Sequence, residues 1–375
     1  EEYAAVLSEL RDARAEAASA AESVTEIMVM HDSPGVRETR LLARGAYDQP
    51  GERVTPETPS VFPPFPTDTP RNRLGLARWL TDPKHPLTAR VAANRFWQLV
   101  FGEGLVRTPE DFGTQGQSPT HPELLDYLAA TFIESGWDIK RLIREMVTSA
   151  TYRQSAMTSP DLMAMDPENR LLGRAQRRQL PAEMLRDAAL QVSGLLVERR
   201  GGPPVKPYEV AVSFKPVKRD TGEGLYRRSV YTYWKRTGPA PAMMALDASK
   251  RDVCRVRRPR TQSPLQALVL LNDPQFVEAG RRLSERLLAA YGPQQLVTTM
   301  FRTVIGREPT DAEQLVVKRL YETQKKYFAL HPEEAALALH TGDAPLDPDL
   351  PVAEVAAGGV LASLLMNFEG FTRYP

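Results

Sequence analysis

Cysteine is almost missing from this sequence, since Cys254 is the only one among 375 residues. No disulfide can therefore form within the chain. Covalent c-type haem is attached through a Cys-x-x-Cys-His motif, and the sequence contains no such motif. We therefore expect no cofactor in this chain.

The sequence also lacks a long apolar run and an excess of charge. A membrane-spanning helix needs about 20 apolar residues, and the nearest approach, residues 352–368, is interrupted by Glu354. Lys and Arg number 48 against 47 Asp and Glu, which leaves a net charge of +1. Such a chain has no global field that attracts nucleic acid or anionic lipid. We expect neither a membrane span nor a nucleic-acid partner.

Motifs of several common enzyme classes are absent as well. The sequence has no Walker phosphate-binding loop, no Gly-x-Gly-x-x-Gly dinucleotide fingerprint and no Gly-x-Ser-x-Gly nucleophile elbow. Whether the chain is an enzyme is left open by the residues alone.

What the sequence does contain is helix-forming composition divided by many turns. Apolar residues make up 42% and charged residues 25%, as in soluble globular proteins. The 32 prolines mark chain reversals and extended connectors. The predicted fold class is mainly α: a multi-helical body, a small strand-bearing N-terminal strap, and an irregular insertion rich in Arg, Pro and Gly. The predicted domains are residues 1–70, 71–200, 201–262 and 263–375.

The most sharply punctuated stretch is the start of the helical body, residues 71–154. Its pattern predicts packed helices over residues 71–80, 86–101, 120–136 and from 138 onward. Thr120 and Glu123 have the spacing of a capping box, Gly136 is expected at C′, and Asp138 is expected as an N-cap. The large aromatic side chains are expected in its core, namely Trp79, Phe96, Trp97 and Trp137.

The N-terminal region has a different character. Residues 3–22 have strong helix-forming composition and only a thin apolar stripe, so we expect them to pack on sequence upstream of this chain. Residues 25–30 and 38–43 read as the strands of a hairpin around a turn at residues 31–35. A proline-rich strap follows, which Val61, Phe62 and Phe65 are expected to hold on the helical body.

The second half of the chain is predicted to return to helix after an irregular region. Pro181 is expected at N1 of a helix that runs to residue 197, and residues 159–169 are expected to be a loop. Residues 225–235 alternate well enough for a strand. Further helices are predicted over residues 264–271, 274–290, 294–305, 310–327, 333–340 and 349–368, with a capping box at Thr310 and Glu313.

Several long runs of this sequence resemble a planctomycete family of unknown function. They are LARWLTDPKHPLTARVAANRFWQLVFGEGLVRTPEDFG (76–113), THPELLDYLA (120–129), FIESGWDIKRLIREMVTSATYRQS (132–155), LYRRSVYTYWKR (225–236) and RPRTQSPLQALVLLNDPQFVEAGR (258–281). The family, of the PSD-one type, forms the C-terminus of proteins that carry planctomycete cytochrome C domains. The resemblance implies a domain of a larger exported protein, extracytoplasmic because c-type haem is attached outside the cytoplasm. Its partners would then be the upstream domains of the same polypeptide.

A basic and aromatic region is the first candidate site. Arginine is favoured where planar contacts to carboxylate, sulfate or phosphate are needed, and aromatic faces suit sugar rings. We expect these side chains to converge on an anion or sugar, such as an acidic or sulfated polysaccharide: Arg227, Arg228, Tyr231, Trp234, Arg257, Arg258 and Arg260. The alternative is an internal ion-pair network that ties irregular chain to the helical body.

A second candidate locus comprises Arg90, Asn94 and His121. Arg90 and Asn94 lie four residues apart and so share one face of a predicted helix. Such a polar ladder either lines a site or caps neighbouring carbonyl groups. His121 with Glu123 would offer nitrogen and oxygen to a metal, but the capping box explains that spacing, and we predict no metal. The function expected is a structural or binding domain; the alternative is part of a redox or polysaccharide-processing enzyme.

Overall fold

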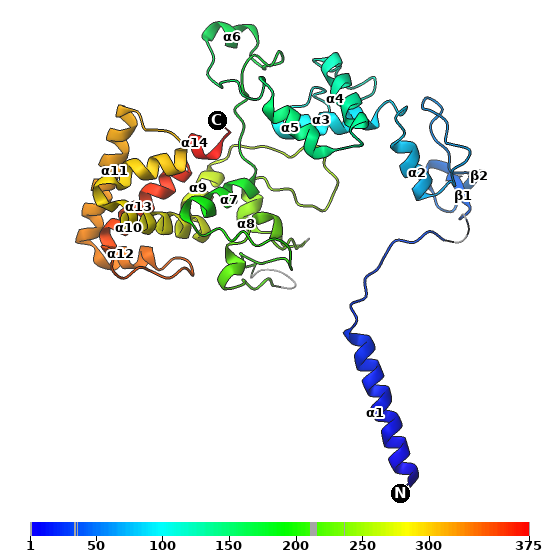
Figure 1. Ribbon diagram of the computed structural model, residues 1–375, viewed down its shortest axis with the longest axis horizontal. Helices are drawn as coiled ribbons and strands as arrows, with labels where there is room; N and C mark the ends of the chain where they lie inside the picture. The colour runs from blue at the N-terminus through cyan, green and yellow to red at the C-terminus, as the bar shows by residue number, and fades with distance from the viewer. Residues whose placement is uncertain (1, 34, 36, 211–215, 236, 375) are drawn as a thin grey trace. The chain divides into compact units, whose positions relative to one another are not determined.

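The computed structural model describes residues 2–33, 35, 37–210, 216–235 and 237–374. These residues divide into two compact units, 1–89 and 90–375. Helices predominate in both, and the strands of the described part form one two-stranded sheet. The predicted fold class, mainly α with a small strand-bearing N-terminal region, is confirmed (Figure 1). No helix in the described ranges is long and apolar enough to cross a membrane.

The first unit opens with helix α1 (Glu2–Ser23), none of whose residues is buried. The strand predicted over residues 25–30 is wrong, because these residues are exposed and form no regular structure, and Pro34 of the expected turn lies outside the described residues. The hairpin forms instead between β1 (Thr39–Leu42) and β2 (Pro50–Val54), which pair antiparallel. A short 3-10 turn at 43–45 closes it locally, so β1 does not need the earlier segment as its partner.

The proline-rich strap packs within the first unit, as predicted, but through fewer side chains. Phe62 stacks on His85, and its ring lies 6.3 Å from that of Trp79. Trp79, on helix α2 (Arg73–Leu80), donates its indole N–H to the Pro63 carbonyl oxygen at 2.8 Å. Val61 is 83% exposed, so its predicted contribution to this packing is wrong.

The second unit contains a first hydrophobic core made by three helices, α3 (Thr88–Phe101), α4 (Pro122–Glu134) and α5 (Ile139–Thr148). Trp97 is buried as predicted, but Phe96 and Trp137 are only partly buried against this core, and Trp79, which was expected in it, packs within the first unit instead. Gly136 has a φ of +70° and Asp138 accepts the Arg141 amide, so both of these cap predictions are confirmed.

The capping box predicted at Thr120 is wrong. His121, and not Thr120, occupies the N-cap of α4, and it makes no side-chain hydrogen bond to the helix. Glu123 therefore stands at N2 and not at the N3 position that a capping box requires. Thr120 instead donates its amide to the Leu105 carbonyl oxygen at 2.9 Å. This bond joins the start of α4 to the loop after α3.

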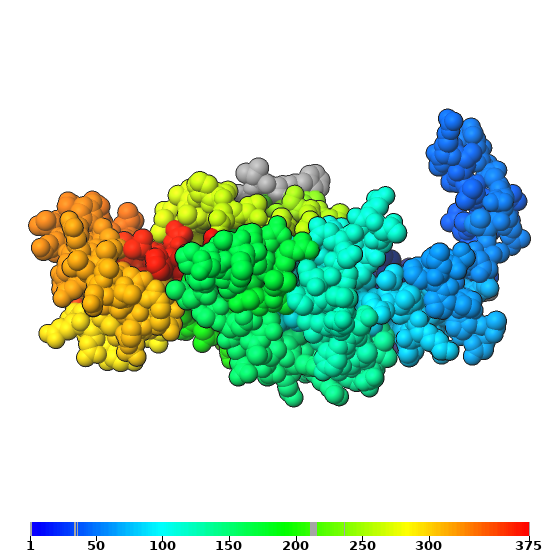
Figure 2. Space-filling model, turned by 90° about the horizontal axis from the view of Figure 1, so that it is seen from above, coloured from blue at the N-terminus to red at the C-terminus, as the bar shows by residue number. Residues whose placement is uncertain are grey.

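A second, larger core lies in the C-terminal part of the same unit. Its helices are α7 (Ala182–Ser193), α9 (Pro264–Asn272), α10 (Pro274–Ile305), α11 (Asp311–Leu330), α12 (Pro332–Leu339) and α13 (Val352–Met366). Helix α13 packs against α10, α11 and α12 and is buried around most of its circumference. In Figure 2 helices α10 to α13, coloured from yellow to red, lie next to one another.

Two details of this core follow from local sequence. Helix α10 is broken at Gly292, with a φ of +71°, and Pro293 starts its second half, as the two separate predicted helices imply. The capping box of Thr310 and Glu313 at the start of α11 is present and confirmed.

The irregular region differs most from the prediction. The strand predicted at 225–235 is wrong: the segment forms 3-10 turns over Gly222–Leu225 and Ser229–Tyr231 and only isolated bridges to Val197 and Val205. In the described part of the protein, no other segment runs beside it far enough to form a continuous series of strand hydrogen bonds. The expected end of α7 at 197 is also wrong, because Gly194 in the left-handed region stops it, and Pro181 is its N-cap rather than N1.

Short helices that the sequence pattern did not reveal are α6 (Pro160–Met165), α8 (Pro241–Ala245) and α14 (Glu369–Thr372). α6 falls in the stretch expected to be a loop, and Ser159 caps it by accepting the Leu162 amide. With six residues or fewer, these helices are too short for a periodic apolar pattern to indicate them.

Candidate functional site

The first of the predicted site residues, Arg227, is fully buried and bound to the chain's own backbone. Its guanidinium donates to the carbonyl oxygens of Pro203, Arg199 and Gly201 and lies 3.9 Å from the centre of the Tyr231 ring. These contacts close the loop at residues 199–203. Arg227 and Tyr231 are therefore brought together, with the arginine buried and the tyrosine half-buried against the chain's own backbone.

Two carboxylates on α7 gather arginines from both predicted Arg-rich runs. Glu183 accepts from Arg258 at 2.7 Å and lies 3.9 Å from Arg251. Asp187, one helical turn later, lies 3.9 Å from Arg228, which also pairs with Glu198 at 2.6 Å. The two runs thus meet along one face of α7, where acidic side chains of the same chain neutralise them. This arrangement corresponds to the ion-pair alternative considered for these residues.

The remaining predicted residues of this group make their hydrogen bonds and ion pairs to segments other than α7, although the Trp234 ring lies 5.0 Å from the Arg251 guanidinium. Trp234 donates its indole N–H to the Lys250 carbonyl oxygen at 2.6 Å. Arg257 lies 3.5 Å from Glu110, and Arg260 donates to the Gly102 carbonyl oxygen at 3.5 Å. The predicted group is therefore distributed over several contacts, and Arg260 alone lies near the end of α3.

The second predicted locus, Arg90, Asn94 and His121, is also used internally. Asn94 is completely buried, and its amide both donates to and accepts from the Val106 backbone, at 3.0 and 2.9 Å. Arg90 donates to Asp126 on α4 at 2.6 Å, an interaction that holds the pKa of the Asp126 carboxyl below its usual value. His121 contacts the Thr120 hydroxyl at 3.0 Å. Among the described residues, no cluster of three or more potential ligands surrounds a metal position.

A different group of arginines lines a pocket of about 360 Å³. Its walls come from the end of α3, the loop after α5, the segment after α6 and the residue Tyr374. The charged side chains that line it are Glu103, Arg107, Arg153, Glu168, Arg170, Arg174 and Arg178. Five arginines against two glutamates leave a clear positive excess in the described lining. We call this cavity the arginine pocket.

The Arg178 side chain is held in the arginine pocket by a hydrogen bond and by an aromatic ring. Its guanidinium donates to the Val100 carbonyl oxygen at 2.8 Å and lies 4.0 Å from the centre of the Tyr374 ring. Burial lowers the pKa of this guanidinium, and the positive charge of Arg260 acts in the same direction. Arg260, from the predicted group, is therefore an electrostatic neighbour of the pocket although it does not line it.

The chain holds Tyr374 over Arg178 through backbone pairing. The Tyr374 amide donates to the Arg178 carbonyl oxygen at 2.9 Å, and the Leu180 amide donates to the Thr372 carbonyl oxygen at 2.9 Å. Residues 178–180 and 372–374 are thus joined although they are far apart in sequence. The same pairing fixes the side of the pocket that Tyr374 forms.

The other arginines of the pocket differ in how many hydrogen bonds they already make within the protein. Arg107 donates to the Glu168 carboxylate at 2.6 Å, and Arg174 donates to the carbonyl oxygens of Asp166 and Pro167. Arg153 is exposed, and its side chain has no partner within the described part of the chain. A ligand entering here would meet a guanidinium that is still able to donate its hydrogen bonds.

Aromatic side chains form the apolar wall of the arginine pocket. Trp97 and Phe101 stack with their ring centres 3.9 Å apart, and Tyr152 meets Phe101 edge to face at 5.9 Å. Guanidinium groups bind carboxylates and sulfates in two-point contacts, while aromatic faces accept apolar faces of a ring. The pocket therefore combines the two kinds of contact that an acidic sugar would use.

A family model whose description is "Protein of unknown function (DUF1553)", PSD1, matches residues 72–321. This chain belongs to the PSD1 family. The match confirms the resemblance inferred from the sequence runs, and it covers the arginines of the pocket and the carboxylates of α7. Tyr374 lies beyond the matched range of PSD1. Comparisons with curated proteins and with solved structures found no match.

The arginine pocket of this PSD1 domain was not visible as a site in the sequence. Its arginines stand among ordinary loop residues in three segments, and the pairing of residues 178–180 with 372–374 supplies its last wall. The one local signal is the basic segment at residues 170–178, which contains four arginines and no acidic residue.

Proposed function

We propose that this PSD1 chain is a binding domain that recognises an acidic carbohydrate, sulfated or carboxylated, in the arginine pocket. The observation that carries the proposal is the convergence of arginines on an aromatic wall, with Arg153 unpaired in the described structure. Sulfate and carboxylate groups are the partners that guanidinium binds best, and the exposed edge of the pocket at Tyr152 and Arg153 leaves room for a polymer to continue outside.

The wider setting of the domain is part of the same proposal. The resemblance of its sequence runs to planctomycete proteins with cytochrome C domains supports a place in a larger exported, extracytoplasmic protein. Its partners would be the upstream domains of that polypeptide, and any c-type haem would be carried there. The expectation that this chain binds no haem stays a prediction, which a haem absorbance band surviving denaturation of the purified protein would contradict.

The test is direct binding of defined oligosaccharides to the purified chain. Isothermal titration with a sulfated glycan fragment, a polyuronate fragment and neutral dextran of matched length should show binding for the acidic polymers and none for dextran. Because the contact is charge-assisted, the Kd for the acidic fragment should rise at higher salt. Binding of dextran with equal affinity would refute the proposal.

A pair of variants places the binding in the arginine pocket. Arg153→Gln removes the unpaired guanidinium and should raise the Kd for the acidic fragment about tenfold or more, which corresponds to about 1.4 kcal/mol. Arg177→Gln is the matched control, because Arg177 is exposed in the same region but does not line the pocket. An equal loss in both variants would indicate general charge attraction, and the pocket would then not be the site.

The alternative, part of a polysaccharide-processing or redox enzyme, has one observation in its favour. Two carboxylates, Glu103 and Glu168, line the arginine pocket, and glycoside hydrolases work with a pair of carboxyl groups. Arg107 already binds Glu168 at 2.6 Å, so that carboxylate is engaged in an ion pair within the pocket. Release of reducing ends from the bound fragment, lost in Glu103→Gln, would support hydrolysis; binding without turnover supports the binding domain.

A further inference from the structure

A second cavity of about 380 Å³ lies in the C-terminal part of the same unit. It is formed at the start of α10, beside α8 and the irregular segments around Tyr208 and Thr232. None of its lining residues belongs to the arginine pocket. We call it the α10 cavity.

One side of the α10 cavity is built on a buried arginine. Arg186 is 4% exposed, and it donates to the Gln275 side chain at 2.6 Å and to the Leu225 carbonyl oxygen at 2.6 Å. Two further bonds reach the Arg227 carbonyl oxygen and the Ser229 hydroxyl. With so many bonds to the protein, this side chain cannot move to suit a ligand. Burial lowers its pKa to about 10.

Asp273 stands beside this arginine at the N-cap of α10. Its Oδ1 accepts the Gln275 amide at 3.0 Å, and Oδ2 has no hydrogen bond within the described residues. Burial raises the pKa of this carboxyl, although the Arg186 charge and the capping bond oppose the shift. The cavity therefore presents a carboxyl oxygen that is partly desolvated and still able to accept a hydrogen bond.

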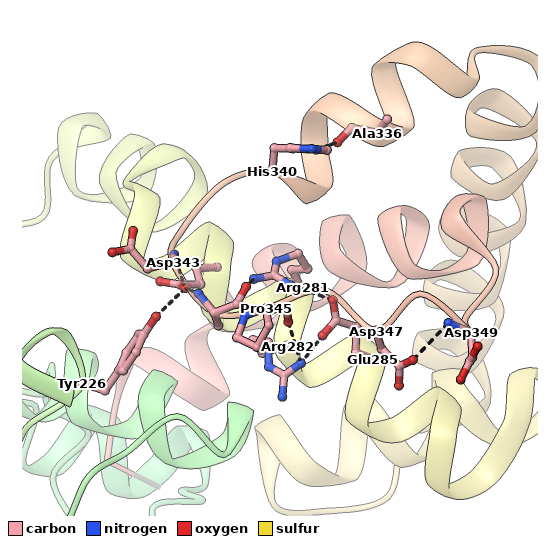
Figure 3. Close-up of polar contacts among 12 residues, drawn as sticks. Tyr226, Arg281, Arg282, Glu285, Ala336, His340, Asp343, Pro345, Asp347 and Asp349 are labelled. Carbon is pink, nitrogen blue, oxygen red and sulfur yellow. Dashed lines mark hydrogen bonds and ion pairs between the residues drawn. The ribbon is translucent and has the colours of Figure 1, made fainter. Parts of the chain in front are cut away.

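The loop that follows α12 also lines the cavity, through Gly342 and Asp343, and Glu278 fixes this wall in place. The buried Glu278 carboxylate accepts the amides of Asp343 and Ala344, each at 2.7 Å, and the Tyr226 hydroxyl at 2.7 Å. Arg281 adds a bond to the Ala344 carbonyl oxygen at 2.7 Å. Figure 3 shows Asp343 in this loop, with Tyr226 and Arg281 near it. The wall is therefore held by three hydrogen bonds to groups outside the cavity, and the Tyr226 hydroxyl helps to fix the Glu278 carboxylate that accepts two of them.

The charges that face the α10 cavity nearly cancel. Asp343 pairs with Arg219 at 2.8 Å across the wall, and Arg186 lies near Asp273. Glu209 adds one exposed carboxylate to the lining. An anion or a cation would meet charges of its own sign about as often as the opposite sign, so the lining favours a ligand without net charge.

Thr232 adds an unsatisfied polar group. The residue lines the cavity and is 4% exposed, and its hydroxyl is buried with no hydrogen-bond partner in the described structure. Buried hydroxyl groups are almost always hydrogen-bonded, so such a group needs a partner that this part of the chain does not supply. A hydroxyl both donates and accepts, and it suits a ligand that does the same.

Apolar side chains complete the lining. Tyr208 and Phe276 are buried aromatic residues, and Met243 and Leu246 contribute aliphatic surface. Small-molecule sites commonly combine a mostly apolar surface with a few fixed polar groups and have volumes of about 300–1,000 Å³. The α10 cavity has this composition, and its volume is at the small end of that range.

We propose that the α10 cavity binds a neutral polyhydroxyl compound the size of a monosaccharide. The Asp273 carboxyl and the Thr232 hydroxyl hydrogen-bond the ligand's hydroxyl groups, and its C–H face packs against the aromatic and aliphatic wall. This site does not depend on the proposed function of the arginine pocket, because the residues and the ligand charge are different.

The first test is saturation-transfer NMR on the full chain with glucose, galactose, mannose, fucose and xylose as separate probes, followed by titration of the best one. At least one neutral sugar should receive saturation and bind with a Kd in the millimolar range or tighter. Glucuronate and glucosamine are the charged comparison probes. Binding of only a charged sugar, or of none, would overturn the proposal, the latter meaning that the cavity holds water alone.

Two variants on one helix locate the binding. Ala242→Leu adds three carbon atoms at the cavity lining, whereas Ala245→Leu adds the same atoms one turn away on α8, outside the lining. Sugar binding should be lost in the first variant and kept in the second. Equal retention in both would place the sugar elsewhere and defeat the assignment.

A third variant separates binding from folding. Thr232→Val removes only the unpartnered hydroxyl, so the melting temperature should stay the same or rise while the Kd for the sugar rises at least fivefold. A lower melting temperature with an unchanged Kd would show that the hydroxyl serves the fold and not the ligand. The arginine-pocket variant Arg153→Gln should leave sugar binding in the α10 cavity unchanged.

Discussion

Arg227 and Tyr231 both hydrogen-bond the backbone of Gly201, on either side of its α-carbon. The Gly201 carbonyl oxygen accepts a hydrogen bond from the Arg227 guanidinium, and the Gly201 amide donates to the Tyr231 hydroxyl at 2.8 Å. The guanidinium itself lies against the tyrosine ring. Two residues that the sequence suggested as part of a ligand site are thus a clamp on the loop at residues 199–203.

Loss of Arg227 should destabilise the protein far more than loss of its neighbour. Arg227→Met removes the donor of three part-buried hydrogen bonds at once, so we expect a loss of about 3 kcal/mol in the free energy of unfolding. Arg228→Met, an exposed ion-pair partner, should cost less than about 1 kcal/mol. Urea unfolding followed by circular dichroism measures both. Similar costs for the two variants would contradict the clamp.

Arg258 should matter little to stability or to anion binding. Its ion pair with Glu183 is 2.7 Å long, but the arginine side chain is 46% exposed, and exposed pairs contribute about 0–1 kcal/mol. The variant Arg258→Ala should therefore keep its melting temperature within a few degrees and bind the acidic oligosaccharide as the parent does. Loss of that binding would restore the originally predicted arginine group as the site.

Gly342 is a position where alanine should be poorly tolerated. Its φ is +95°, and an added Cβ would lie 2.1 Å from the Glu278 carboxyl carbon. Gly306, with a φ of +79° and open space around it, is the matched control. Gly306→Ala should cost about 1–2 kcal/mol, and Gly342→Ala should cost about 1–3 kcal/mol more because of overpacking. Calorimetric melting of the two variants would compare them, and equal costs would contradict the contact with Glu278.

Glu313 should make the protein more sensitive to acid. Two bonds from Arg307 and one from the Thr310 amide lower the pKa of the Glu313 carboxyl from 4.5 to about 2. A lowered folded-state pKa stabilises the fold at pH above about 4.5, and this contribution is lost as the pH falls from there to about 2. The stability difference between the parent and Glu313→Gln should therefore be present at pH 6 and shrink toward zero near pH 2. A difference that does not vary with pH would show that the carboxylate charge is not responsible.

The N-terminal helix should exchange its amide hydrogens quickly. None of the residues of α1 is buried, and isolated helices of this length are marginal in water. Hydrogen exchange read by mass spectrometry should show protection factors for 2–23 several orders of magnitude below those of α13, which is buried on most sides. Equal protection would mean that α1 packs on another surface.

The helices could be predicted because their signals are local. Asp138 and Thr310 start helices through hydrogen bonds to residues within one turn, and Gly136 ends a helix through its own backbone angle. The residues that set these helix ends are therefore all visible in a short stretch of sequence. The same holds for Trp97, whose place on the apolar face of a helix follows from periodicity.

The site could not be predicted in the same way because its causes are distant. Arg178 and Tyr374 meet through a backbone pairing that spans most of the second unit, and no local pattern encodes it. The strand expected at 225–235 failed for the related reason that a strand needs a neighbour, and residues 222–231 find hydrogen bonds in 3-10 turns and in contacts to Arg186 instead.

The place of Tyr374 also bears on how the protein should be prepared. Because its ring covers Arg178, an affinity tag fused after residue 375 would begin next to one wall of the arginine pocket, and an acidic tag there would compete with an anionic ligand. A tag at the other end of the sequence, joined to the exposed helix α1, would leave that wall as it is. Measurements of anion binding should therefore be made on N-terminally tagged protein, or after the tag has been removed by a protease.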